Sequence, residues 1–450
     1  MDVTAKIAQF VANAKYENLP PAAITTAKVA VRDCLGVALA GSKEEDAKIC
    51  AEIARQEQAK EESTVIGQGF KSSALNAALA NGTAAHAMDF DHSFTLMGQP
   101  TAPIIPATFA LGEALGVSGR QIIEAYAVGY EVTAKLVHSL RDSEHDGWHA
   151  PSTLGSFGAA AACSKLLGLD AGQVEMALGI SASMAGGVVA NFGTMTKPLH
   201  VGLGARNGVL AAKLAQSGFT ANGKAIESSF GFYKVLHAGT SVHENPIEEL
   251  GRSYALVSDG IRIKPYPCGG LTHQAIDSIL EFRAKHGLTP EMVESIEVDV
   301  AKHTFERIVF KVPQTSIQGK FCMPYLMARA LVDGKVSLHA FTDAAVREPN
   351  VLKLAERVQM NLDNDLKKTD PGGRPCRVTV RTKSGQTYTR EEQFAKGGPE
   401  FPLTEDELRG KFTECARETL SAGAAERALG QIEKLEQVDN VRSLMDILRG

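Results

Sequence analysis

The sequence predicts a mainly α-helical protein with a large all-helical domain and a smaller α+β lid domain. Three observations lead to this fold class. Apolar residues recur at helical spacing from the start to about residue 260, and strand-like alternation is nearly absent there. Short alternating segments appear among helical ones after residue 261. The chain has 450 residues, which is too long for one ordinary core and favours two domains.

The first domain is predicted as a succession of helices separated by short breaks that contain glycine. Pro20-Pro21 suits the first turn of a helix, and Ser118 and Asp170 occupy positions typical of N-caps. The helical segments predicted in this way are 3–14, 104–115, 118–137, 154–167 and 171–184.

The second domain is predicted from alternating segments that are typical of strands. These segments are 295–300, 376–381 and 386–390, and Lys383-Ser384-Gly385 between the last two indicates a hairpin. A Gly-Gly-Pro break at 397–399 leads into a helical C-terminal segment from residue 404. We therefore expect a discontinuous helical domain, 1–261 with 395–450, and a lid domain over 262–394.

Composition and charge exclude several functional classes. The net charge is −5, so no general basic field attracts nucleic acid or an anionic membrane. No long uncharged apolar run suits a membrane span, and the N-terminus resembles neither a secretory signal nor a transit peptide. Seven cysteines without a CxxC pair favour reduced thiols. We expect a cytoplasmic protein whose partner is a small anionic substrate.

The segment from His86 to Ser93 concentrates two imidazoles and two carboxylates within eight residues. His86, Asp89, Asp91 and His92 are residue types that act as metal ligands or as acid–base groups. A polar helix end capped by aspartate is the structural alternative. No second run with ligand spacing accompanies the segment, so we expect no catalytic metal.

Two further segments place cationic side chains at loop–helix junctions. His149 lies directly before a long apolar helix, where the helix dipole favours anions. Lys197 and His200 precede a glycine-rich run at 202–208. No strand precedes this run, so it does not predict a dinucleotide site, and its glycines favour close helix packing. A purely structural role for His149 stays open at this point.

Two segments of the second domain carry further candidates. Two prolines and two glycines fix an irregular loop from Lys264 to His273. Cys268 in this loop is either a nucleophile or, more commonly, a buried unreactive thiol. Tyr325 opens a helix and is either a core aromatic residue or a phenolic acid at the domain boundary.

Several motifs, in this order and spacing, resemble the MmgE/PrpD family. They are MDFDHS, GWHAPSTLGSFGAAAA, TKPLHVGLGARNG, KPYPCGGLTH, GKFCMPYLMARALVDG and KGGPEFPLTEDELRGKF. The resemblance covers nearly the whole chain. It implies a helical domain with a smaller lid, a homodimer, a site between the domains and no cofactor. The activities of the family are 2-methylcitrate dehydration, cis-aconitate decarboxylation and iminodisuccinate epimerisation.

The resemblance also implies site residues. Those expected to be catalytic are Asp89, His149, Lys197 and Tyr325. Those expected to bind substrate are Ser93, Gln99, His200, Lys264 and His273.

Two departures separate this chain from the decarboxylases of the family. Those enzymes carry a histidine where this chain has Gln99 and another where it has Gly269. Glutamine cannot shuttle a proton at neutral pH, and glycine has no side chain. We therefore expect a lyase or isomerase that transfers a proton next to a carboxylate of a di- or tricarboxylate, by dehydration or epimerisation. The alternative is a non-catalytic family member that binds a polycarboxylate.

Overall fold

The computed structural model describes residues 2–94, 96–140, 147–236, 242–366 and 373–450. The chain folds into two compact units, and each is described by itself. One unit comprises Met1–Ile261 with Thr404–Gly450, and the other comprises Arg262–Leu403. The sequence placed the return to the first unit at residue 395. The segment before residue 404 stays with the second unit, where Ile263 donates a backbone hydrogen bond to the carbonyl of Gly397 at 2.8 Å.

The first unit is a bundle of helices, as predicted, and also contains a short two-stranded antiparallel ribbon. Its helices are α1 (Val3–Asn13), α2 (Pro21–Gly41), α3 (Glu45–Gln56), α4 (Ala74–Ala87), α5 (Thr101–Leu115), α6 (Gly119–Ser139), α7 (Ala150–Leu166), α8 (Ala171–Met184), α9 (Thr196–Gln216), α10 (Phe232–Leu236), α11 (Asn245–Glu248), α12 (Ala255–Ser258), α18 (Glu405–Arg417), α19 (Ala422–Glu433) and α20 (Arg442–Leu448). Its strands are β1 (Ser63–Val65) and β2 (Phe70–Ser72). The predicted N-caps Ser118 and Asp170 both form capping boxes.

The glycine-rich run lies inside α9 and permits close helix packing, as predicted. A Cβ atom on Gly202 would lie 2.3 Å from the hydroxyl of Thr83 on α4. One on Gly208 would lie 2.3 Å from the Cβ of Ala159 on α7. Helix α9 therefore lies close against both helices, which brings its N-terminal residues to the ends of α4 and α7.

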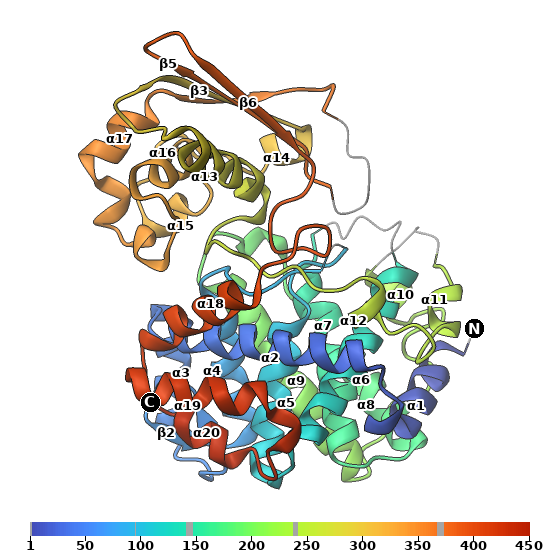
Figure 1. Ribbon diagram of the computed structural model, residues 1–450. Helices are drawn as coiled ribbons and strands as arrows, with labels where there is room; N and C mark the ends of the chain where they lie inside the picture. The colour runs from blue at the N-terminus through green and yellow to red at the C-terminus, as the bar shows by residue number, and fades with distance from the viewer. Residues whose placement is uncertain (1, 95, 141–146, 237–241, 367–372) are drawn as a thin grey trace. The chain divides into compact units, whose positions relative to one another are not determined.

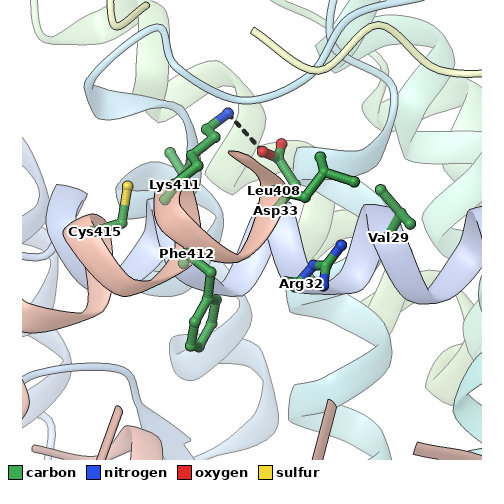
Figure 2. Close-up of a pocket in the computed structure, with 9 residues that line it drawn as sticks. Val29, Arg32, Asp33, Leu408, Lys411, Phe412 and Cys415 are labelled. Atoms are coloured by element: carbon green, nitrogen blue, oxygen red, sulfur yellow. Dashed lines mark ion pairs between the residues drawn. The ribbon is translucent and has the colours of Figure 1, made fainter. Parts of the chain in front are cut away.

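The C-terminal helices pack onto the N-terminal part of the chain. Helices α18 and α19, red in Figure 1, lie against α2, which is blue. Lys411 of α18 and Asp33 of α2 form a buried ion pair of 2.5 Å, drawn as a dashed line in Figure 2. Both side chains line a small pocket between the two helices, together with Val29 and Phe412.

This ion pair also holds the loop that follows α4. The ammonium group of Lys411 donates to the carbonyl oxygen of Phe90 at 2.9 Å and lies 3.9 Å from the centre of its ring. The second oxygen of Asp33 accepts from the backbone N–H of His92 at 3.0 Å and lies 3.2 Å from its Nδ1. The backbone on both sides of Asp91 is therefore fixed by buried charged groups.

The second unit contains a four-stranded sheet in the order β4-β3-β5-β6. Its strands are β3 (Val293–Val300), β4 (Val358–Leu362), β5 (Cys376–Thr382) and β6 (Thr387–Glu392). Its helices are α13 (His273–His286), α14 (Lys302–Phe305), α15 (Ser316–Gly319), α16 (Met323–Asp333) and α17 (Pro349–Ala355). The predicted hairpin is confirmed as β5 and β6, which pair antiparallel, whereas the parallel edge strand β4 was not predicted.

Within the described ranges, no helix combines the length and the apolar character that crossing a membrane requires.

We predict that Lys411→Met destabilises the first unit by about 3–5 kcal/mol, because it leaves the Asp33 carboxylate buried without its cation. The midpoint of urea unfolding, followed by the helical circular dichroism signal, measures this loss. Arg409→Met on the same helix is the matched control, since its partner Glu433 and Arg409 itself are more exposed. Its cost is expected to stay below about 1 kcal/mol. Equal midpoint shifts in the two variants would show that the buried pair adds nothing.

Candidate active site

A buried histidine–carboxylate pair marks the end of α4 and the loop after it. The Nδ1 atom of His86 lies 3.1 and 3.0 Å from the two carboxylate oxygens of Asp91, and both side chains are buried. A carboxylate at Nδ1 keeps the ring proton on that nitrogen and leaves Nε2 as an acceptor. Within the part of the chain that the structure describes, Nε2 of His86 is buried and has no hydrogen-bond partner. The sequence indicated His86 as a possible metal ligand or acid–base group, but it was not among the residues expected to be catalytic or to bind substrate.

Asp89, in the same loop, forms an ion pair with Lys197. The Nζ atom of Lys197, in the first turn of α9, lies 2.8 Å from an oxygen of Asp89, and the two side chains are 16% and 13% exposed. Asp89 has a φ of +52°, in the left-handed region. Such a conformation costs about 1–3 kcal/mol at a non-glycine residue, although aspartate tolerates it better than most. The fold therefore maintains a strained residue in order to present this carboxylate to the lysine.

Three imidazole rings lie close together near this ion pair. The ring centres of His86 and His149 are 5.5 Å apart, and those of His149 and His200 are 5.4 Å apart. The Nδ1 atoms of His149 and His200 lie 3.3 Å from each other, which is hydrogen-bond distance. Phe192 places its ring edge-on to His149, and the ammonium group of Lys197 lies 5.6 Å from the centre of the Phe192 ring.

Short backbone contacts hold His149 and His200 in place. His149 directly precedes α7, and its N–H donates to the carbonyl of Gly187 at 2.8 Å. The hydroxyl of Ser152, in the first turn of α7, donates to the carbonyl of His200 at 2.8 Å. The end of α9 that carries His200 is thus tied to the start of α7.

The electrostatic environment keeps both of these histidines neutral. Burial lowers the pKa of His149 far below its ordinary value of 6.5, and the nearby His86, Lys197 and His200 lower it further, whereas Asp89 opposes the shift. Burial also lowers the pKa of His200, with His86 and Lys197 adding to the effect. Both rings are therefore neutral at neutral pH, and a neutral imidazole can accept a proton at one nitrogen and donate one from the other.

The predicted substrate residues Ser93 and Gln99 lie in the segment that joins α4 to α5, and both are half-buried. Phe94 and Gly98 form an isolated antiparallel bridge within it. A Cβ atom on Gly98 would lie 3.5 Å from the ring of Pro151, so this segment packs against the first turn of α7. The contact of Ser93 and Gln99 with substrate stays a prediction.

The other three predicted residues belong to the second unit. Lys264 is buried, and His273 opens α13 with its Nε2 atom 3.3 Å from the carbonyl oxygen of Cys268. Tyr325 is fully buried in α16; its hydroxyl donates to the carbonyl of Ala340 and accepts from Nε of Arg329 at 3.2 Å. These bonds are those of a core tyrosine, and a catalytic role for Tyr325 stays a prediction.

Four residues from three separate motifs thus come together in the first unit: Asp89, His149, Lys197 and His200. Their catalytic and binding roles stay predictions. In the described ranges, no group of three or more His, Cys, Asp or Glu side chains is arranged to hold a metal ion.

Sequence comparison matches both parts of the chain to one family. Residues 5–245 match the MmgE/PrpD N-terminal domain, and residues 266–437 match the MmgE/PrpD C-terminal domain. The chain belongs to the MmgE/PrpD family. Its motifs from Asp89 to His200 therefore lie in the N-terminal family domain, whereas Lys264 falls just before the C-terminal one.

Curated members of the MmgE/PrpD family align with this chain over nearly their whole length. Cis-aconitate decarboxylase of Mus musculus is 29% identical, with 100% of this chain and 93% of that protein covered. Cis-aconitate decarboxylase of Homo sapiens is 28% identical, with 100% and 95% covered. Cis-aconitate decarboxylase of Aspergillus terreus is 25% identical, with 99% and 96% covered.

The lowered pKa values of His149 and His200 predict how the stability of this MmgE/PrpD protein depends on pH. Below the ordinary pKa of 6.5 the unfolded chain protonates both rings more readily than the folded chain does, so the unfolded state binds more protons. The free energy of unfolding should therefore fall as the pH is lowered through 6.5. We expect the melting temperature to drop more between about pH 7.5 and 5.5 in the wild type than in His149→Gln/His200→Gln.

Replacing an exposed histidine provides the control for that comparison. His286 is exposed and stacks on Tyr388 in the second unit. His286→Gln should keep the wild-type change of melting temperature with pH. A double variant that loses as much stability as the wild type over the same pH range would contradict the assignment of two neutral buried rings.

Proposed function

We propose that this chain is a lyase that acts on a small tricarboxylate through a carbanion next to a carboxylate group. The observation that carries the proposal is the placement of the Lys197 ammonium group beside two neutral, mutually hydrogen-bonded imidazoles. The names of the full-length relatives, cis-aconitate decarboxylases of mouse and human, support a tricarboxylate as the substrate class.

Removal of a proton next to a carboxylate requires a cation, a base and an acid. A proton on a carbon next to a carboxylate is weakly acidic, so the enzyme must stabilise the negative charge that develops on the carboxylate oxygens when the proton leaves. Lys197 supplies a cation for this charge from the first turn of the long helix α9, whose N-terminal dipole has the same sign. His149 and His200 supply neutral nitrogens that can act as base and acid.

The Lys197–Asp89 ion pair holds the ammonium group of Lys197 in a defined position. The ammonium group is held 2.8 Å from the carboxylate, and both groups are only slightly exposed. An arriving substrate carboxylate shares or replaces this contact, so it meets a cation that is already positioned. Asp89 also offsets the positive charge next to His149 and His200.

Dehydration of a hydroxy-tricarboxylate is the reaction we favour. The family resemblance implies that decarboxylases carry histidines at the positions that Gln99 and Gly269 occupy in this chain. A Cβ atom on Gly269 would lie 2.9 Å from the ring of Phe321, so a side chain at this position requires Phe321 to move. The second candidate is decarboxylation of cis-aconitate, which is favoured by the names of the relatives.

Proton NMR of the purified protein in D₂O separates these candidates. The panel is citrate, 2-methylcitrate, cis-aconitate and iminodisuccinate. We expect a hydroxy-tricarboxylate to lose water, with solvent deuterium entering the carbon next to a carboxylate when the reaction runs in reverse. Loss of carbon dioxide from cis-aconitate would favour the second candidate. Exchange on iminodisuccinate alone would indicate an epimerase, and saturable binding without any exchange would indicate a non-catalytic protein.

We predict that Lys197→Met lowers kcat by about 10²–10³ while the fold is kept, because it removes one donor to the developing charge. Lys213→Met, on the exposed end of the same helix, is the matched control and should turn over like the wild type. Circular dichroism and steady-state kinetics on the active substrate of the panel measure both variants. A near-normal kcat in Lys197→Met would place this lysine outside the reaction.

A further inference from the structure

The contact between His149 and His200 restricts the protonation of both rings. Their Nδ1 atoms lie 3.3 Å apart, and both side chains are buried. A neutral imidazole carries one N–H group, on either Nδ1 or Nε2. A hydrogen bond between two Nδ1 atoms needs one donor and one acceptor, so one ring must carry its proton on Nδ1 and the other on Nε2.

We propose that His149 and His200 form a reciprocal acid–base pair, in which the Nε2 atom of one ring is a base whenever the Nε2 atom of the other is an acid. The proposal rests on the proposed function and deepens it, because it assigns His200 to proton transfer. A lyase that removes a proton from one atom and protonates a leaving group needs one base and one acid. The shared Nδ1 bond supplies one of each in every neutral state of the pair.

The surroundings of the pair keep it in this state. Among the described residues, the neighbours of the two rings include the imidazole of His86, the ring of Phe192 and the Lys197–Asp89 ion pair. Burial and the nearby Lys197 disfavour an imidazolium ion on either ring, whose pKa values are both lowered. The hydroxyl of Ser152 donates to the carbonyl of His200, and the N–H of His149 donates to the carbonyl of Gly187, so the backbones that carry the two rings are held in place.

The proton balance for an elimination closes with these two residues. Nε2 of His149 takes the proton from the substrate carbon, and the C–H electron pair stays on the substrate. His149 then passes its Nδ1 proton to Nδ1 of His200. His200 gives its Nε2 proton to the departing hydroxyl as the C–O bond breaks with its electron pair, so water leaves and the carbon–carbon double bond forms.

The pair begins and ends neutral, with the two tautomers exchanged. One proton returned to water from Nε2 of His149, one taken from water by Nε2 of His200, and the reverse transfer across the Nδ1 bond restore the first state. Reaction in the opposite direction uses the exchanged state directly. Neither ring has to remain charged between turnovers.

Nitrogen NMR of the full-length protein labelled with ¹⁵N-histidine tests the pair directly, without any substrate. Spectra of His149→Asn and His200→Asn assign the two signals, and His286→Asn serves as a control that removes an unrelated signal. At about pH 7.5 we expect opposite tautomers at positions 149 and 200, both neutral. Two identical tautomers, or an imidazolium at either position, would overturn the proposal. Should an Asn variant not fold, the Gln variant takes its place for assignment.

A double-mutant cycle on the active substrate adds a functional readout. Each single Asn variant should lower kcat by about 10²–10⁴, and the double variant should be no slower than the slower single variant. Losses that multiply would show two independent residues and overturn the pair. If the wild type turns over no substrate of the panel, the proposed function fails, whereas the NMR result still decides whether the two rings share one proton.

Discussion

The carboxylate of Asp33 is the anchor on which the candidate site depends. One of its oxygens lies 2.5 Å from the ammonium group of Lys411, and the other accepts from the backbone of His92. Lys411 also donates a hydrogen bond to the carbonyl of Phe90, which holds the loop after α4. With Phe90 and His92 fixed, Asp91 between them can hold His86, and Asp89 next to them can keep its strained backbone.

The same arrangement explains why the site is so polar and yet so buried. A buried charge is costly unless it is paired or hydrogen-bonded. Asp33 is paired with the cation of Lys411 and Asp89 with that of Lys197, and Asp91 is hydrogen-bonded to the imidazole of His86. His92 continues the network, because its Nε2 lies 2.6 Å from the hydroxyl of Thr101. Buried networks of charged and hydrogen-bonded side chains fix geometry more than they add stability, since the cost of desolvating the charges offsets much of their mutual attraction. The fold therefore uses part of its stability to place neutral imidazoles beside a cation.

The sequence predicted the secondary structure better than the contacts between distant helices. The helical and alternating patterns indicated the bundle and the hairpin of β5 and β6, because both depend on local periodicity. The motifs around Asp89, His149 and Lys197 came from the family resemblance and meet in one unit. The roles of Asp33 and Lys411 were not predictable from the sequence. The two residues are far apart in the chain, and they form an ion pair only because α18 packs on α2. For Tyr325, the sequence could not distinguish a tyrosine that packs in the core from one that acts as an acid.

The position of Lys411 in the chain also orders the folding of the protein in time. Asp33 and the loop after α4 leave the ribosome early, but their cation comes more than three hundred residues later, after the whole second unit. Domains fold as units during synthesis, so the second unit, which is continuous in sequence, can form before the first is complete. A nascent chain therefore holds the acidic loop without its counter-charge until α18 emerges. The site cannot be complete until Lys411 emerges, and any chain released before residue 411 lacks this cation.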